Sequence, residues 1–572
     1  MVIKIPGANV PRRWITTEDF SLYKSAFQLL TIPENQVIPN FEHQPVKLQP
    51  DATILPLHRI LNNFISNHVI FTTADIHERY PIDTEELTSF LEQVAASDQL
   101  LKIPATADMD EDRWGKPELL ERARRVTLRL QHQQIKPCDP SDFQNYLFKW
   151  HHIAEESRLT RYDDFLELME QYQGLFLPAE IWETQVIRKR MTVYNQQWLD
   201  ELILSGELIW YGDAAGSGDR GNLAFSFKED LPLFYRYNNK QNDADSAEAI
   251  HTIRRILKNR GASFLNDVVM ETGLSSSICQ TALWEMIWRG EVTNDSFAVI
   301  RSGKPAPITT DLQRSSLHSR KGRMDSYRYR SRMRLTGGGR WSLLPDAAEA
   351  YSDSETVEKI SRQMLRRHGL LSRELYDQKL SVIPWDRLYD SLVKMEWRGE
   401  IKRGYFVSSL SGVQFATPET AAALTSSGQE NTAGSRHAHA SGEHYTLLNT
   451  CDPANMYGAA SPFPLLHPRH LEWRLLRHPH NFLIYLNGSP IISIEAKGSR
   501  LTPLRDLAPD QLAKALSLLP RLLDEQTGWN IIRSLKVELW DQQPIRNTAV
   551  VSILKELGFR NEFKMMILEK SM

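Results

Sequence analysis

Four stretches of the chain repeat one pattern around a turn residue, and no other feature constrains the fold as strongly. Each has Leu seven residues before the turn residue, an apolar residue four before it, Glu or Gln just after it, and then another apolar residue. The turn residues are Asp98, Gly206, Gly290 and Gly399. Apolar residues at this spacing line one face of a helix, and Gly at a helix end supplies a left-handed cap. The pattern therefore predicts four copies of a helix that leads into a strand.

Each copy also has an earlier helix end, a short turn and a second helix start, in residues 67–80, 172–183, 260–273 and 367–378. Residues 207–227 and 400–416 then alternate as strand, glycine turn, strand. This is the element order of a winged-helix domain. Four unrelated helix ends are the alternative, but agreement at every offset in all copies favours a repeat.

The region after residue 444 differs in character from the repeats. Residues 481–498, NFLIYLNGSPIISIEAKG, contain two β-rich runs around Asn487-Gly488, which predicts a hairpin. A long amphipathic helix and a strand–helix–strand order follow. The predicted fold class is mainly α with β wings: a tandem winged-helix array followed by an α+β, β-rich C-terminal module.

The length of 572 residues fits three to five domains. We expect four winged helices, at 51–110, 161–235, 246–303 and 341–418, and a C-terminal module at 445–572. An N-terminal entry segment at 1–50 precedes them. The connecting segments are a helical connector or further winged helix at 111–160, a basic linker at 304–340 and a flexible tether at 419–444.

Composition excludes several classes of protein. No stretch approaches the 18 or more apolar residues of a membrane span, and the N-terminus does not resemble a signal peptide. The three cysteines, Cys138, Cys279 and Cys451, are far apart, which indicates buried thiols in a reducing compartment. A cytoplasmic location without membrane contact is therefore expected.

A basic segment at 314–340 stands out because the net charge of the chain is −3. It holds nine Lys or Arg residues, one Asp and two Tyr. Arginine contacts phosphate and tyrosine stacks on bases, so the segment predicts nucleic-acid binding, with a solvated linker as the alternative. The predicted binding residues, which include three from the wing of copy four, are Arg320, Lys321, Arg323, Tyr327, Arg328, Tyr329, Arg330, Arg332, Arg334, Arg340, Lys402, Arg403 and Tyr405.

Motifs for cofactors and metals are weak or absent. GSGDRG at 216–221 matches a dinucleotide pattern, but a strand-like run follows instead of a helix, so it is a wing turn. No phosphate-binding motor motif occurs. His437, His439 and His444 lie in a Ser/Ala/Gly-rich stretch that is typical of a tether. We expect no metal and no cofactor.

The stretch CDPANMYGAASPFP at 451–464 is rich in turn residues yet apolar. Asp and Asn side chains bond to nearby backbone, so Asp452 and Asn455 predict a fixed, folded turn. Asn455, Tyr457 and Phe463 then either pack the terminal module onto the fourth repeat or line a slot of the size of a base. The sequence favours packing and leaves both open.

Residues 339–345, 403–418, 452–464 and 556–559 resemble the C-terminal region of large helicase-related (Lhr) proteins. Residues 12–27 resemble the segment just before that region, so the likeness runs along nearly the whole chain. The resemblance implies winged helices followed by a β-rich module, here as a free-standing chain without the helicase motor. It further implies DNA, double- or single-stranded, as a partner, and a separately encoded helicase in repair or genome defence.

The resemblance also implies a DNA glycosylase, because uracil excision is assigned to some family members. Such chemistry needs a carboxylate near a flipped base. The acid proposed in the family lies in the last few residues, where this chain offers Glu569; Asp452 is the other candidate. A third hypothesis is a homo-oligomeric scaffold whose repeats dock proteins.

Overall fold

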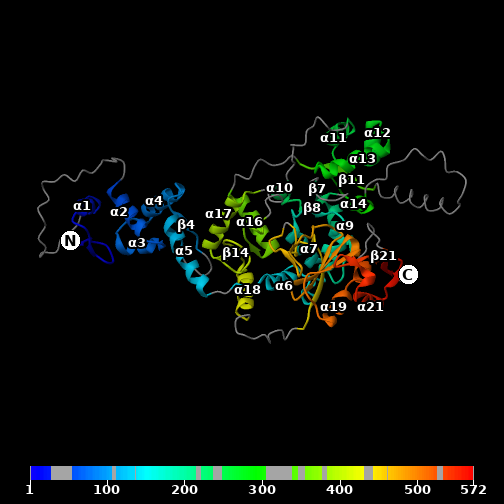
Figure 1. Ribbon diagram of the computed structural model, residues 1–572. Helices are drawn as coiled ribbons and strands as arrows, with labels where there is room; N and C mark the ends of the chain where they lie inside the picture. Colours follow the sequence, from blue (N-terminus) through cyan, green and yellow to red (C-terminus); the bar gives the residue numbers. More distant parts are fainter. Residues whose placement is uncertain are drawn as a thin grey trace. The chain divides into compact units, whose positions relative to one another are not determined.

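The computed structural model describes residues 2–27, 55–105, 111–134, 137–213, 221–235, 248–303, 338–345, 354–376, 383–430, 442–459, 461–524 and 533–570 (Figure 1). The chain divides into two compact units. Unit 1 comprises Met1–Ile135 and Val393–Gly404, and unit 2 comprises Lys136–Leu392 and Tyr405–Met572. None of the helices in the described ranges has the length and apolar character that a membrane crossing requires.

Unit 1 contains the first winged helix. Asp83 caps the recognition-type helix by accepting hydrogen bonds from the N–H groups of Glu85 and Glu86, and Trp114 of the wing is buried in the core. The winged helix consists of α2 (Pro56–Asn67), β3 (Phe71–Thr72), α3 (Thr73–Arg79), α4 (Thr84–Ala96), β4 (Leu101–Ile103) and β5 (Arg113–Gly115), with strand order β3-β5-β4. Before and after it lie β1 (Val2–Lys4), β2 (Arg12–Trp14), α1 (Phe20–Ala26) and α5 (Pro117–Gln134).

The second copy opens unit 2. It is preceded by α6 (Pro140–Trp150) and the short turn η1 (Glu155–Ser157). Its own elements are α7 (Tyr162–Tyr172), β6 (Leu177–Pro178), the π-helical turn η2 (Trp182–Ile187), α8 (Arg188–Arg190), α9 (Gln196–Ser205), β7 (Leu208–Asp213), β8 (Asn222–Phe227) and α10 (Leu231–Phe234), with strand order β6-β8-β7.

The third copy packs on the second. Its elements are α11 (Glu248–Arg260), β9 (Ser263–Phe264), α12 (Leu265–Thr272), α13 (Ser276–Trp288), β10 (Val292–Asn294), α14 (Ala298–Ser302) and β11 (Arg340–Leu343). Six side chains of α13 are buried, on more than one face of the helix. Trp210 of β7 donates a hydrogen bond to the Asn294 carbonyl at 2.8 Å, and the Trp288 ring lies against Gly212 and Gly221. The recognition-type helix of copy three therefore faces protein.

The fourth copy and the terminal module follow, mostly in unit 2; residues 393–404 of copy four belong to unit 1. Copy four has α16 (Ser354–His368), β12 (Leu370–Leu371), α17 (Trp385–Trp397), β13 (Lys402–Gly404), β14 (Gln414–Ala416) and α18 (Pro418–Glu430). The module has a six-stranded sheet of β15 (Tyr445–Asn449), β18 (Phe482–Leu486), β19 (Ser489–Glu495), β20 (Arg500–Pro503), β22 (Leu539–Trp540) and β23 (Gln543–Pro544), in that spatial order.

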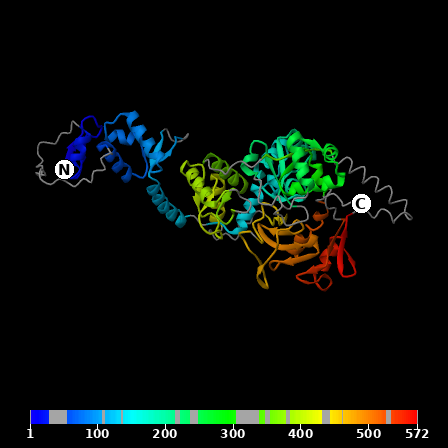
Figure 2. The same cartoon turned by 90° about the horizontal axis from the view of Figure 1, so that it is seen from above.

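Two smaller sheets and three helices accompany the large sheet of the module. They are β16 (Leu465–His467) with β17 (His470–Trp473), β21 (Ser534–Val537) with β25 (Met565–Glu569) and β24 (Arg560–Glu562), and the helices α19 (Pro509–Leu516), α20 (Arg521–Asp524) and α21 (Val550–Glu556). Figure 2 shows the module, in orange and red, lying beside the second copy. Lys189 of copy two donates a hydrogen bond to the Leu447 carbonyl of the module at 2.6 Å, which is consistent with this arrangement.

The repeat predicted from sequence is confirmed. The four turn residues have positive φ angles of 57°, 78°, 69° and 78° in chain order. The leucines seven residues earlier are all fully buried. The fold class, a winged-helix array followed by a β-rich module, is confirmed with it.

Two expected boundaries are wrong. Strand β5 pairs with β3 and β4, so the wing of copy one extends to Gly115 and the connector begins later than residue 111. Strand β11 pairs with β10 and β9, so Arg340–Leu343 completes copy three and does not open copy four. The basic segment thus connects two strands of one wing. The described residues of 117–160 form helices and turns without a wing sheet, which argues against a fifth winged helix.

The hairpin predicted around Asn487-Gly488 is β18–β19, and it touches α6. A Cβ on Gly488 (φ 77°) would lie 1.9 Å from the Ser141 carbonyl oxygen, whereas a Cβ on Gly206 (φ 78°) would meet nothing within 4 Å. Gly206→Ala should cost roughly 1–2 kcal/mol of unfolding free energy from backbone strain alone. Gly488→Ala should lower the free energy of unfolding by roughly 1–3 kcal/mol more than Gly206→Ala does, because its Cβ would overlap the Ser141 carbonyl oxygen. Equal losses in denaturant titrations would contradict this contact.

Candidate functional site

The loop at 451–464 is folded through its own side chains. The Asn455 amide donates hydrogen bonds to the carbonyls of Thr450 (2.9 Å) and Tyr457 (3.1 Å). Its oxygen accepts from the Tyr457 N–H (2.9 Å) and the Tyr485 hydroxyl (2.7 Å). Arg477 adds bonds to the carbonyls of Thr450 and Asn455. The fixed turn expected from the sequence is present.

A buried ion pair anchors this loop to copy two. Two nitrogens of Arg190 donate to the two carboxylate oxygens of Asp452 at 3.0 and 2.8 Å, and both side chains are fully buried. Arg190 Nε also donates to the Tyr172 hydroxyl at 2.8 Å, which lies 2.6 Å from His151 Nδ1. Burial is the largest influence and lowers the pKa of Arg190, but Asp452 and Tyr172, through their charges and hydrogen bonds, together raise that pKa above its ordinary value. These four residues are the Arg190 cluster.

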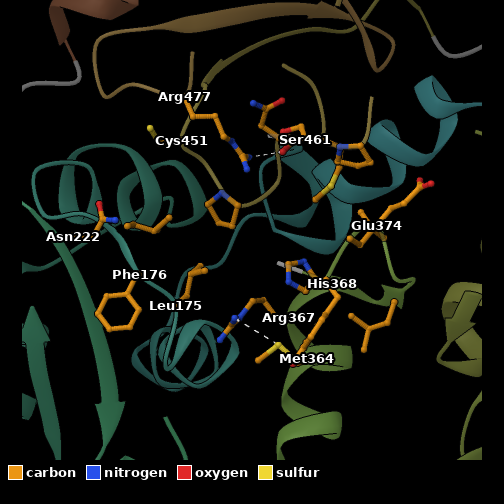
Figure 3. A pocket seen from close by; sticks show the side chains of 18 of the residues that line it. Leu175, Phe176, Asn222, Met364, Arg367, His368, Glu374, Cys451, Ser461 and Arg477 are labelled. Atoms are coloured by element: carbon orange, nitrogen blue, oxygen red, sulfur yellow. Dashed lines mark hydrogen bonds between the residues drawn. The ribbon is translucent and has the colours of Figure 1, made fainter. Parts of the chain in front are cut away.

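A cavity of about 280 Å³ lies beside the cluster, where three parts of unit 2 meet. Copy two contributes residues 175–178 and Asn222, copy four contributes the end of α16 and the residues up to Tyr376, and the loop contributes several residues between Cys451 and Pro462. Figure 3 shows Arg477 reaching toward the cavity from the loop side and Arg367 and His368 from α16. We call this cavity the three-way pocket.

One end of the three-way pocket is polar and cationic. The Arg367 side chain is buried, with 4% of its surface exposed. One guanidinium nitrogen donates a hydrogen bond to the Gln173 carbonyl at 2.6 Å, and another lies 3.8 Å from the Met364 sulfur. The third nitrogen, Nε, has no partner among the described residues. Burial lowers the pKa of Arg367 to about 10, so it stays charged at neutral pH. Burial, with the charges of Arg367 and Arg477, lowers the pKa of His368 to about 3. His368 Nδ1 and Ser461 Oγ are also buried without a partner in the described residues.

A second concave feature, the basic groove, lies on the terminal module. It is lined by residues that include Arg474, His478, His480, Lys497 and Arg500, with Glu495 as the acidic member. Arg474, Lys497 and Arg500 are exposed. Ala496 and Lys497 have positive φ angles of 50° and 61°, a strained backbone of the kind that concentrates at functional sites.

Most of the predicted nucleic-acid residues lie outside the described residues: Arg320, Lys321, Arg323, Tyr327, Arg328, Tyr329, Arg330, Arg332 and Arg334. Arg340 pairs with Asp295 at 2.6 Å and is half-exposed. In unit 1, Lys402 is exposed while Arg403 is buried 3.5 Å from Glu121. Tyr405 is half-buried. These four residues belong to two units, and Arg403 is not exposed.

The three base-pocket candidates lie in different surroundings. Asn455 lines the three-way pocket, but its polar atoms are taken up by the loop. Tyr457 and Phe463 bridge each other and belong to the hydrophobic core beneath the loop, with ring centroids 5.4 Å apart. Both rings are packed among core side chains, and their role as base-pocket residues stays a prediction.

The two catalytic candidates are not brought together. Asp452 is fully buried in its ion pair, and Glu569 is exposed at the end of β25, opposite Ser534 of β21. Neither lines the three-way pocket. Their catalytic roles stay predictions. Among the described residues, no group of three His, Cys, Asp or Glu side chains is placed to hold a metal ion.

Arg367, His368 and Arg477 were not among the residues predicted from the sequence. Arg367 and His368 end a helix just before Gly369, where basic residues usually complement the helix dipole and carry no further meaning. Only the pairing of that helix end with copy two and the loop, far away in sequence, makes them a site.

Comparison with known proteins supports the domain assignments. Residues 138–228 and 350–436 match two families described as large helicase-related protein, winged-helix domain, the third and the fourth such domain respectively. These regions are Lhr winged-helix domains. A Mycolicibacterium smegmatis protein named Lhr helicase/probable uracil glycosylase is 30% identical over 416 residues, 72% of this chain and 27% of that protein.

A second Lhr relative, Lhr helicase/uracil glycosylase of Escherichia coli, is 24% identical over 547 residues, 88% of this chain and 33% of its own length. The chain thus spans about a third or less of these Lhr relatives. Among solved structures, Streptomyces sahachiroi DNA glycosylase AlkZ aligns with 68% of this chain and 97% of its own, at 12% identity and a TM-score of 0.38. A score this low does not establish a common fold.

Breaking the Arg190 cluster should destabilise the protein. Arg190→Met or Asp452→Asn each leaves a buried charge unpaired, so each should lower the free energy of unfolding by roughly 3–5 kcal/mol. The double variant Arg190→Met/Asp452→Leu should recover part of that loss. Denaturant titration measures both. Single-variant losses below about 1 kcal/mol, typical of a surface pair, would count against the cluster as an anchor.

Stability should also fall in mild acid through His151. Burial, with the neighbouring Arg190 charge, lowers the pKa of His151 well below 6.5, so it stays neutral when folded. Below pH 6.5 the unfolded chain binds a proton there that the folded chain does not, so stability is lost as pH falls. His151→Phe should reduce the slope between pH 6.5 and 5 by up to about 1.4 kcal/mol per pH unit. An unchanged slope would show that His151 does not contribute.

Proposed function

We propose that this chain is the nucleic-acid-binding part of an Lhr-type DNA repair system. The observation that carries the proposal is the match of two winged-helix domains to the Lhr families. A helicase motor, encoded separately or elsewhere in a longer protein, would supply ATP-driven movement. DNA glycosylase activity on uracil is the second candidate, because both relatives carry that activity in their names.

Three of the four described recognition-type helices, α4, α9 and α13, are poorly suited to reading a DNA groove. Helix α17 carries Arg387 and Lys394 beside three acidic residues. Helix α13 is buried against copy two. Helices α4 and α9 carry acidic side chains and no Lys or Arg, as their sequences TEELTSFLEQVAA and QQWLDELILS show. Carboxylates repel phosphates, so these helices disfavour groove entry. We assign phosphate contact in the described residues to the basic groove, with the basic segment as an additional arm.

Binding through phosphates makes a testable prediction. The protein should bind labelled duplex and single-stranded DNA with little sequence preference, and the affinity should fall steeply with salt. Arg474→Glu and Lys497→Glu should each weaken binding and lower the slope of log K against log salt by about one. Lys555→Glu, on exposed helix α21, is the matched control and should bind as the unmodified protein does. Equal effects of all three would refute the groove.

The same protein tests the second candidate. Uracil-containing DNA incubated without ATP and then treated with hot alkali should break at uracil if the chain is a glycosylase. Binding without cleavage would leave a binding component, and absence of both would favour the scaffold hypothesis. Asp452→Asn needs a parallel stability measurement, since loss of the ion pair alone can abolish activity.

A further inference from the structure

The three-way pocket holds a positive charge that its surroundings do not balance. Arg367 forms no ion pair with any described residue; its printed partners are a carbonyl oxygen and a sulfur. Within the described part of the chain, Arg477, on the loop side, bonds to the backbone carbonyls of Thr450, Asp452 and Asn455 and to no side chain. Glu374 also lines the pocket, but it is exposed and accepts a hydrogen bond from Ser411. Two arginines face one peripheral carboxylate.

An unbalanced buried cation is costly, so its presence needs a reason. Burying a charge without a partner loses hydration that a carbonyl only partly replaces. A methionine of similar length would fill the same space without that cost. Arg367 Nε, His368 Nδ1 and Ser461 Oγ are all buried, all without partners among the described residues, and all belong to residues that line the pocket. Their hydrogen-bonding capacity is therefore not satisfied within the described protein at the wall of the pocket.

The rest of the lining limits what the ligand is. Leu175, Phe176, Met456 and Tyr376 give the pocket an apolar wall beside its cationic end. The volume of about 280 Å³ lies near the lower end of the roughly 300–1,000 Å³ of small-molecule sites. Such a space suits one planar ring with one anionic group. Arginine binds phosphate through paired N–H donors, which makes phosphate the best anionic group for this end.

We propose that the three-way pocket binds a single phosphorylated nucleotide, with its phosphate between Arg367 and Arg477 and its base against the apolar wall. The nucleotide is either free or the phosphorylated end of a DNA strand. Binding of a DNA strand end rests on the proposed function, whereas binding of a free nucleotide does not. Because copies two and four and the terminal loop all line the pocket, the bound nucleotide clamps three parts of unit 2 together.

The test is calorimetric titration of the full chain with a deoxynucleoside 5′-monophosphate, the matching deoxynucleoside, and inorganic phosphate. The monophosphate should bind about ten-fold or more tightly than the deoxynucleoside, and it should raise Tm. Arg367→Met should lose that preference. Arg366→Met is the matched control: its arginine is the next residue of α16, half-exposed and paired with Glu170, and this variant should bind normally.

Two further measurements keep the proposal open to refutation. Arg367→Met should be as stable as the unmodified protein without ligand, because it removes an unbalanced charge; a large loss of stability would show that the arginine is structural and overturn the proposal. Arg367→Lys, which keeps the charge but removes the paired donors, should weaken monophosphate binding and leave deoxynucleoside binding unchanged. Equal binding of monophosphate and deoxynucleoside to the unmodified protein would also overturn it.

The strand-end source is tested with oligonucleotides that carry a 5′-phosphate or a 5′-hydroxyl, each competing with the monophosphate. Stronger competition by the phosphorylated strand identifies a strand end as a ligand, and equal competition identifies the free nucleotide. DNA binding that persists without any monophosphate binding sinks this inference alone. Monophosphate binding without any DNA binding sinks the proposed function alone.

Discussion

The buried ion pair between Arg190 and Asp452 is the interaction on which unit 2 depends. Both side chains are fully excluded from water, so neither charge is tolerable unless the loop sits on copy two in one register. The pair fixes Asp452, the Asp452 carboxylate also accepts the Ala454 N–H, and Asn455 closes the turn beside it. One bidentate contact thus positions a loop that then forms a wall of the three-way pocket. The pair adds little net stability, because both charges lose their hydration on burial, but it allows the loop only one arrangement on copy two.

The fold could be predicted from sequence where the signal was local. A leucine seven residues before a turn residue and an apolar residue after it were enough to find four winged helices, because helix ends and wing starts are adjacent in the chain. Strand β11 could not be assigned, since its partner β10 ends 46 residues before Arg340 begins it. Strand pairing at such distances is decided by side-chain packing, here Trp341 in the core of copies two and three, and the sequence carries no marker for it.

The site was less predictable than the fold for the same reason. Asp452 and Asn455 were expected to build a turn, and they do so. No sequence pattern marks a partner for Asp452, because Arg190 lies 262 residues away and looks like the end of a basic helix turn, RKR. Arg367, likewise, looks like an ordinary C-terminal helix residue. Charges that are unremarkable in sequence acquire meaning only when tertiary contacts bury them.

The four repeats have one architecture but unequal surroundings, and this divergence explains where ligands can bind. Copy three has turned its recognition-type helix inward, against β7 and Trp210, so it contributes a packing surface. Copies two and four have left a cavity where α16 meets the turn before β6. A protein that buries Arg367 there without a carboxylate accepts a cost in the empty state, and an anionic ligand removes that cost on binding. The same ligand then tightens the junction that the Arg190–Asp452 pair holds, which links occupancy of the pocket to the cohesion of the whole unit.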